Sequence, residues 1–416
     1  MVPTKRERAL NRVARLREGI SDFLEVRTTI RTGFDVVDET LVRRQRILEA
    51  LGGTEKEWND WRWQLANRVR DIDTLVKLID LEARDLGEID RVSRKYRWAV
   101  SPYYLSLIDF SDRFSPVRLQ SIPLIAELHV RGGVDDPMDE EYTNPAGAIT
   151  RRYPDRLTIY ASNMCPTYCR HCQRRRLIGQ RDRHTTWRKL EESIEYIRDC
   201  SEIRDVLITG GDPLTRTDSD LERLVSSIRS IGHVEIIRIG TRAPVTMPQR
   251  VTPGLARTLA RYQPVYVNTQ FNHPLEITPE SAEACRLLAD AGIPLGNQMV
   301  LLNGINDRCS VVKVLNQELL RIRVKPYYIF HAKEVKGTRH FVTSVDKGIE
   351  IMEFLRGYTS GLAIPTYVIN APHGHGKTPI YPNYVLSRGP DFITIRTWEN
   401  RVFRYPNRRE VDIRQF

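Results

Sequence analysis

The sequence predicts an α/β protein with a parallel sheet that is closed or partly closed into a barrel. From Arg156 onward, short β-rich runs alternate with helical stretches at roughly thirty-residue intervals, as expected for strands joined by crossover helices. The expected strands span residues 157–161, 205–209, 234–239, 265–270, 295–301, 324–330 and 366–370. The expected helices span residues 187–198, 219–230, 253–262, 279–291, 310–321 and 345–358. In such a barrel the carboxyl ends of the strands carry the chemistry.

Two further regions flank the predicted barrel. Residues 4–81 are charged and place apolar side chains at helix spacing, which predicts amphipathic helices. Several prolines and the pair Gly132-Gly133 interrupt residues 101–150, so we expect this stretch to link and cover the barrel. We therefore divide the chain into an N-terminal helical region 1–100, a linker and cover region 101–150, a partial barrel 151–358 and a C-terminal extension 359–416.

Composition indicates a globular protein of the cytoplasm. The 416-residue chain is 41% hydrophobic, which is enough for a large core. Residues 1–20 mix basic and acidic side chains without an apolar stretch, so we expect neither a signal peptide nor a membrane span. The net charge of +11 is spread along the chain among 53 acidic residues, and it fits anionic small substrates and cofactors as well as nucleic acid.

Half of the six cysteines lie in one short stretch, Cys165-x3-Cys169-x2-Cys172, which we call the cysteine loop. Three thiolates suit iron-sulfur chemistry better than structural zinc, which prefers four ligands, and they leave one iron of a [4Fe-4S] cluster open to an organic cofactor. Basic side chains within 170–176 are expected to lower the thiol pKa values. The scattered cysteines are expected to be buried thiols without disulfides: Cys200, Cys285 and Cys309.

Polar residues follow several of the expected strands at the point where each strand ends. These stretches are 209–212, 240–242, 270–273 and 328–333. In the first, Gly210-Gly211-Asp212 (the glycine turn) permits close approach of the backbone to a ligand, and Asp212 can contact a polar amino acid group. Such a turn is more often only a turn, but its expected place beside the cysteine loop favours ligand binding.

The stretch Gly376-Lys377-Thr378 follows the last expected strand and admits more than one interpretation. A nucleotide-binding P-loop is rejected, because Ala371 stands where its first glycine is needed and Pro379 opposes the helix that must follow. A lysine on a glycine-rich loop can form a Schiff base with pyridoxal 5'-phosphate (PLP), which delocalises an unpaired electron. From the residues alone, an ordinary surface lysine stays open as well.

The chain resembles the lysine 2,3-aminomutase family of radical S-adenosylmethionine (SAM) enzymes over roughly positions 58 to 390. The motifs that carry the resemblance are 63–65, 102–107, 152–156, the cysteine loop, the glycine turn, 272–274, 296–298 and 376–379. The resemblance implies a partial (β/α)6 radical SAM barrel with an N-terminal helical region and a C-terminal extension that binds PLP. It also implies three cofactors, a [4Fe-4S] cluster, SAM and PLP.

By this resemblance the motifs acquire roles. The cysteine loop holds the cluster, and Lys377 is the catalytic residue that carries PLP. Arg174 matches the arginine that binds the substrate α-carboxylate, and its planar guanidinium can pair with both oxygens. The implied ligands of SAM are Gly210, Gly211, Asp212 and Gln298. The implied ligands of the PLP phosphate are Arg152, Tyr153 and Arg156.

Two departures from the family pattern concern the substrate and zinc. Lysine-specific members place two aspartates around the distal ammonium of the substrate, and the matching positions here are Lys333 and Asn370. A distal carboxylate would gain a salt bridge and a hydrogen bond there, so this pair resembles the glutamate-acting branch of the family. The alternative is that Lys333 is solvated and the pocket uses other residues. Lysine-type members bind zinc through C-terminal cysteines, which are absent after Cys309, so we expect no zinc.

The resemblance implies an isomerase that moves the α-amino group of L-glutamate to the β-carbon and forms β-glutamate. A 5'-deoxyadenosyl radical would remove a β-hydrogen, while PLP stabilises the substrate radicals. An external electron donor and a homo-oligomer are the implied partners. The alternatives are an aminomutase or radical deaminase for another amino acid, such as lysine or arginine, and an iron-sulfur electron carrier or RNA-binding protein. The lack of an aromatic, basic RNA-reading module argues against nucleic acid as a partner.

Overall fold

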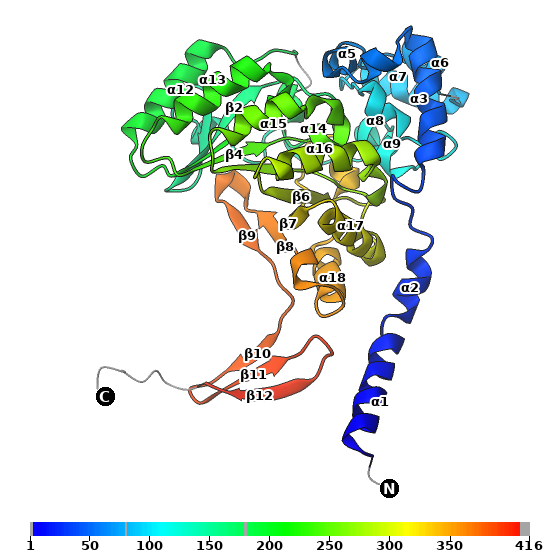
Figure 1. The fold of residues 1–416 in the computed structure, drawn as a ribbon, viewed down its shortest axis with the longest axis vertical. Helices are drawn as coiled ribbons and strands as arrows, with labels where there is room; N and C mark the ends of the chain where they lie inside the picture. The colour runs from blue at the N-terminus through cyan, green and yellow to red at the C-terminus, as the bar shows by residue number, and fades with distance from the viewer. Residues whose placement is uncertain (1–2, 80, 179–180, 408–416) are drawn as a thin grey trace.

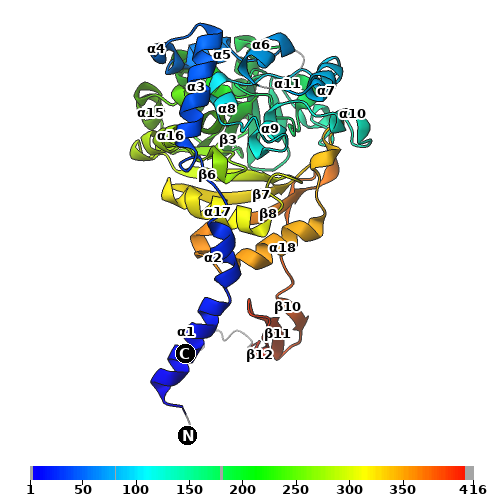
Figure 2. The same ribbon diagram turned by 90° about the vertical axis from the view of Figure 1, so that its right-hand side faces the viewer.

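The computed structural model describes residues 3–79, 81–178 and 181–407 of the 416-residue chain. Its body is a curled sheet covered by helices, and the N-terminal helix α1 (Lys5–Glu18) projects from that body as an arm (Figure 1). Figure 2 shows from the side that α1 and a small C-terminal sheet both extend beyond α18 (Val345–Leu355), away from the large sheet.

A nine-stranded sheet forms the body, and its strands lie side by side in chain order. They are β1 (Ile149–Arg151), β2 (Arg156–Ser162), β3 (Asp205–Gly210), β4 (Ile236–Gly240), β5 (Val265–Thr269), β6 (Leu295–Leu301), β7 (Val324–His331), β8 (Thr366–Asn370) and β9 (Lys377–Pro379). Strands β2 to β8 pair in parallel, whereas β1 and β9 pair antiparallel at the two edges. Because β1 and β9 do not pair with each other in the described chain, the barrel is partial, and the predicted fold class is confirmed.

Helices carry the chain from each parallel strand to the next. They are α12 (Trp187–Asp199), α13 (Asp218–Arg229), α15 (Pro253–Ala260), α16 (Pro279–Asp290), α17 (Cys309–Arg321) and α18. Each expected strand and helix of the barrel is present, with ends that differ from the prediction by three residues or fewer. Side-chain oxygens cap the first turns of four of these helices, at Thr217, Thr252, Thr278 and Ser344.

Side-chain alternation on the strands separates the hydrophobic core from the barrel interior. On β6, Leu295, Met299 and Leu301 are buried in the main core, whereas Gln298 between them lines a cavity. Arg238 on β4 likewise lies between two buried isoleucines and lines the same cavity. The inner face of the curled sheet is therefore polar, and the outer, apolar face packs against the helices.

Residues 21–129 form further helices, of which α3 to α9 gather at one end of the barrel, whereas α2 packs against α17 (Figure 1). Their bounds are α2 (Ser21–Arg27), α3 (Val37–Leu51), α4 (Glu55–Trp58), α5 (Trp61–Ala66), α6 (Ile72–Leu78), α7 (Ala83–Ser93), α8 (Pro102–Ser106), α9 (Pro116–Ser121) and α10 (Ala126–His129). Short helical turns occur at Glu141–Thr143, Arg175–Ile178 (α11), Pro213–Thr215, Ala243–Thr246 (α14), Pro248–Arg250, Pro274–Glu276, Arg339–Phe341, Gly361–Ala363 and Pro372–Gly374. None of the helices described is long and apolar enough to cross a membrane.

A separate three-stranded sheet closes the described chain, with β10 (Val385–Arg388), β11 (Phe392–Arg396) and β12 (Val402–Pro406). An ion pair of 2.6 Å between Arg12 and Glu399 ties α1 to the hairpin that joins β11 and β12. The rings of Tyr358 and Trp398 pack edge to face, with centroids 5.0 Å apart, and attach the same hairpin to the end of α18. This sheet was not among the expected elements, because its strands are short and largely exposed.

Candidate active site

A cavity of about 360 Å³ lies at the carboxyl ends of the parallel strands. Every residue that the sequence analysis singled out for a cofactor or substrate lines it: Arg152, Tyr153, Arg156, Cys165, Cys169, Cys172, Arg174, Gly210, Gly211, Asp212, Gln298, Lys333, Asn370 and Lys377. These residues come from several strands and loops that are far apart in the sequence. Their convergence is what a single active site requires.

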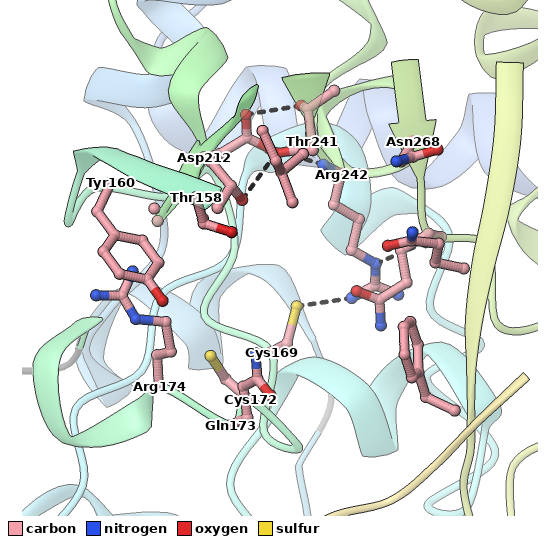
Figure 3. Close-up of a pocket in the computed structure, with 18 of the residues that line it drawn as sticks. Thr158, Tyr160, Cys169, Cys172, Gln173, Arg174, Asp212, Thr241, Arg242 and Asn268 are labelled. Carbon is pink, nitrogen blue, oxygen red and sulfur yellow. Dashed lines mark hydrogen bonds between the residues drawn. The ribbon is translucent and has the colours of Figure 1, made fainter. Parts of the chain in front are cut away.

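The cysteine loop leaves β2 and enters the cavity from one side. Cys169 accepts a hydrogen bond of 2.8 Å from Nη1 of Arg242 (Figure 3). This buried guanidinium also forms an ion pair with Glu276. All six cysteines are free thiols. No three His, Cys, Asp or Glu side chains in the described ranges are placed to hold one metal ion, so the three thiols do not converge on a single-ion position.

The expectation that basic neighbours lower the thiol pKa values is wrong for two of the three thiols. Burial, and then repulsion from neighbouring negative groups, raises the pKa of Cys165, and burial raises the pKa of Cys172 to about 11. The basic neighbours do not offset this burial, and two of them, Arg170 and Arg175, pair with the buried Glu127. Thiolates in this loop therefore need a positive partner such as iron.

The cysteines outside the loop follow the expectation only in part. Cys285 on α16 is fully buried, and burial raises its pKa to about 12. Cys200 and Cys309 are only half-buried, because they lie at the ends of α12 and α17 and not in their packed middles. The prediction that all three are buried thiols is therefore wrong for these two.

The glycine turn holds the end of β3 against the start of the cysteine loop. Gly210 has φ of +146°, and an added Cβ would collide with the backbone of Ser162, while a Cβ on Gly211 would collide with the carbonyl of Met164. The carboxylate of Asp212 accepts hydrogen bonds from the Leu214 and Arg242 amides and from the Thr241 hydroxyl (Figure 3). Burial outweighs these bonds and raises the Asp212 pKa. Asp212 thereby joins the ends of β3 and β4.

Lys377 lies on β9, at the edge of the sheet, and not on a helix as a P-loop lysine would. Its amide donates a hydrogen bond of 2.8 Å to the hydroxyl of Tyr153. Its Nζ lies 5.6 Å from the ring of Tyr153 and 5.9 Å from the rings of Tyr328 and Phe330. Burial, followed by repulsion from Arg238 and Arg156, lowers the Lys377 pKa to about 8.

Three arginines gather around Lys377 and create a site for an anion. Arg156 stacks 3.8 Å above the ring of Tyr153, and Arg238 forms an ion pair of 2.8 Å with Asp205. Nε of Arg152 is buried and has no hydrogen-bond partner among the described residues. This orphaned donor and the surrounding rings are suited to a phosphate and a flat aromatic ring, as PLP would bring.

Arg174 also lines the cavity, and its guanidinium carbon lies 3.4 Å from the ring centre of Tyr160 (Figure 3). Its Nε contacts Glu140 at 3.3 Å, while its buried Nη1 finds no partner in the described chain. Burial alone would raise the pKa of Glu140, but Arg174 and Arg176 outweigh it and hold this pKa below its usual value. One face of Arg174 is thus fixed, and one donor remains for a ligand.

Lys333 and Asn370 both line this cavity. Burial, and then repulsion from Lys377 and Arg152, lowers the pKa of Lys333 to about 7. Nδ2 of Asn370 is buried without a hydrogen-bond partner in the described structure. The side chain of Lys333 therefore does not point away into solvent, and the cavity contains a cation and an amide donor that can both serve a ligand.

Sequence reasoning missed Glu140, Tyr160, Arg238 and Arg242 as cavity residues. Arg238 could have been found, because it is the charged residue in the alternating run Ile237-Arg238-Ile239 and must face the interior. Arg242 lies in a stretch already noted at a strand end, but its contact with Cys169 depends on the tertiary fold. Glu140 belongs to an acidic loop whose approach to the barrel left no local signal.

Comparison with known proteins shows the family to which the chain belongs. A model of the radical SAM superfamily matches residues 159–313, and a model named lysine-2,3-aminomutase matches residues 352–413. Glutamate 2,3-aminomutase of Clostridioides difficile (strain 630) is 56% identical over 98% of this chain and 96% of its own length. The chain belongs to the lysine 2,3-aminomutase family. L-lysine 2,3-aminomutase of Clostridium subterminale is 48% identical over 85% of each chain.

As a member of the lysine 2,3-aminomutase family, the protein is a radical SAM aminomutase and thus an isomerase. The interpretations as an electron carrier or an RNA-binding protein are therefore set aside. Radical SAM enzymes use a [4Fe-4S] cluster and SAM, and lysine 2,3-aminomutases also use PLP. The cavity fits this set, because it joins three free thiols to a lysine that is surrounded by arginines and aromatic rings.

Proposed function

We propose that this aminomutase converts L-glutamate into β-glutamate by moving the amino group from C2 to C3. The pair of Lys333 and Asn370 in the cavity carries the proposal, because a cation and an amide donor favour a distal carboxylate over a distal ammonium. The identity of 56% with a protein named glutamate 2,3-aminomutase supports the same substrate.

The cofactors would occupy adjoining parts of the cavity. The cysteine loop would hold the cluster, while the glycine turn and Gln298 would bind SAM. Lys377 would attach PLP, with the phosphate held by Arg152, Tyr153 and Arg156. When bound, the cluster and SAM supply a carbon-centred radical that removes a hydrogen atom, and PLP delocalises the unpaired electron.

The residues of this chain would hold the substrate at both ends. Nη1 of Arg174 is free to donate to the α-carboxylate, and Lys333 and Asn370 can bind the distal carboxylate. With both ends held, the C2–C3 bond stays in one place while the amino group moves, which favours rearrangement over escape. The lowered pKa of Lys377 leaves part of its amine neutral near pH 7, which is the form that attacks a carbonyl.

The substrate is tested with anaerobic, reconstituted enzyme, PLP, SAM and a reductant. The enzyme is offered glutamate, glutamine, lysine and arginine separately, and each product is identified by mass and retention time. We expect β-glutamate from glutamate and little reaction with the basic amino acids. Turnover of lysine or arginine without turnover of glutamate would contradict the substrate, and a deaminated product would point to a related radical deaminase.

The affinity for glutamate is expected to fall as the pH rises above about 7, the pKa of Lys333 in the ligand-free cavity. Below this pKa the lysine is charged and can bind a carboxylate, whereas above it binding must first take up a proton, so KM rises by up to about tenfold per pH unit. Bound anions raise this pKa, so the rise in KM then begins at a higher pH. The measurement is KM for glutamate from about pH 6 to about pH 9. Lys333→Arg keeps its charge and should flatten the profile; equal slopes in both enzymes would contradict the role of Lys333.

We also propose a homo-oligomer that works in the cytoplasm with an external electron donor. Helix α1 has no buried residue as described, and Leu10, Val13 and Leu16 lie exposed along it. The nearby β12 exposes Val402, Phe403 and Tyr405, so the projecting arm offers apolar surface to a second copy. Light scattering should give a mass above that of the 48.3 kDa chain, and a monomeric mass would contradict this part.

We propose the following roles for the four regions of the chain. The N-terminal helical region 1–100 supports the barrel 151–358, and the linker region 101–150 covers it. The C-terminal extension 359–416 supplies the PLP lysine.

A further inference from the structure

Glu140 is a buried carboxylate in a cavity whose charged lining is mostly basic. It is 7% exposed and lies in the acidic loop of residues 135–141, before the first strand of the sheet. Burial of a carboxylate is costly unless cations and hydrogen-bond donors compensate the charge. The position of Glu140 therefore indicates that its charge has a specific partner.

The partner of Glu140 is the arginine pair at 174 and 176. Its Oε2 accepts from Nε of Arg174 at 3.3 Å and from Nη2 of Arg176 at 3.0 Å. Its Oε1 accepts from the hydroxyl of Tyr160 at 3.2 Å, and the ring of this tyrosine supports the face of the Arg174 guanidinium. Glu140 and Tyr160 together fix both the plane and the rotation of this guanidinium.

The donor that remains on Arg174 is buried, and Arg174 lines the cavity. Nη1 has no partner among the described residues, although a buried guanidinium donor is costly to leave unpaired. A carboxylate that enters the cavity can satisfy it. Glu140 binds Nε of the guanidinium and leaves Nη1 free for this carboxylate.

The backbone that carries Glu140 is itself held in place. The carboxylate of Asp136 accepts hydrogen bonds from the Glu140 amide at 2.8 Å and from Arg176 at 2.7 Å. Asp139 contacts Nδ1 of His373 at 2.5 Å, and both of these residues have positive φ, 46° and 57°. Because His373 lies in the loop that leads to Lys377, the acidic loop connects the Arg174 side of the cavity with the lysine side.

We propose that Glu140 is a positioning residue that orients Arg174 for the substrate α-carboxylate. The inference rests on the proposed function only in taking Arg174 as the α-carboxylate ligand. It does not depend on the distal group of the substrate, because every α-amino acid carries the α-carboxylate. Without the charge of Glu140, repulsion from Arg176 and Arg152 turns the guanidinium away, and the substrate has to restore its orientation on binding.

The test is the variant Glu140→Gln, which keeps the size of the side chain and removes its charge. We expect KM to rise about tenfold or more, with a smaller change in kcat, since a hydrogen bond between charged groups is weakened. The iron content, the PLP absorbance and the melting temperature are expected to stay at their wild-type values. Glu141→Gln is the matched control, because it removes the same charge from an exposed neighbour in the same loop, and its KM should not change.

A double-mutant cycle with Arg174→Lys separates positioning from general support of the fold. In the Arg174→Lys background, Glu140→Gln is expected to change KM by less than about twofold, because the guanidinium that it positions is already gone. The KM effect should also be equal for every amino acid that the wild type turns over. If the wild type uses lysine and not glutamate, the proposed function fails while this comparison can still be made with lysine.

Three results would overturn the inference. The first is an unchanged KM in Glu140→Gln. The second is a loss of iron, PLP and activity in equal proportion, because that would make Glu140 a structural residue. The third is full additivity with Arg174→Lys. If Glu140→Gln does not fold, Glu140→Asp gives the comparison, because it keeps the charge but withdraws the carboxylate from Arg174. It should raise KM in the wild-type background and change KM by less than about twofold in the Arg174→Lys background.

Discussion

Replacement of Lys377 by alanine is expected to remove bound PLP and to lower activity by about 10³-fold or more. The structure places this lysine between three aromatic rings and close to three arginines, where it can hold a cofactor that carries a phosphate. Without the amine, PLP has no covalent link to the chain, and the arginines alone retain it weakly. The measurements are the visible absorbance of the purified protein and the rate of product formation under anaerobic conditions.

The control for this prediction is Lys325→Ala. Lys325 lies near the amino end of β7 in the same sheet, is exposed, and is not among the residues that line the cavity. It should keep both the absorbance band and the rate, and the iron content of both variants should equal that of the wild type. A Lys377→Ala enzyme that retains the band and its activity would remove Lys377 from the reaction.

The fold was predictable where the hydrophobic pattern repeats. The strands and helices of the barrel alternate in the sequence with a regular spacing, and each buried strand is followed by an amphipathic helix that covers it. The edge strands β1 and β9 and the small sheet β10 to β12 were not predicted, because each is short and packs little apolar surface. Their pairing depends on neighbours that are brought near by the barrel.

The site was predictable where its residues stand at strand ends or form a dense local motif. The cysteine loop and the loop of Lys377 are such motifs, and alternation on β4 would have added Arg238. Glu140 could not be found, since its partner Arg174 lies 34 residues further along the chain. The thiol pKa values were predicted with the wrong sign for Cys165 and Cys172, because the sequence shows basic neighbours but does not show that the fold buries both thiols.

Reversal of the charge at Lys333 is expected to be the most informative change for the substrate. In Lys333→Asp, a distal carboxylate would meet a carboxylate in place of an ammonium group, with Asn370 in the same cavity. We expect kcat/KM for glutamate to fall by about 10³-fold, because loss of an attractive charge and gain of a repulsive one act together. The PLP absorbance and iron content should stay near wild type, since Lys377 and the cysteine loop are unchanged.

The double variant Lys333→Asp, Asn370→Asp tests the same idea in the opposite direction. Two carboxylates would then face the distal end of the substrate, and a distal ammonium would be attracted where it was repelled before. We expect measurable turnover of lysine with almost none of glutamate, and Lys325→Asp, which reverses an exposed charge on β7, the strand that leads to Lys333, should leave the preference unchanged. If Lys333→Asp leaves the kinetics with glutamate unchanged, Lys333 does not contact the substrate, and specificity must come from other cations of the cavity, with Arg238 as the first to examine.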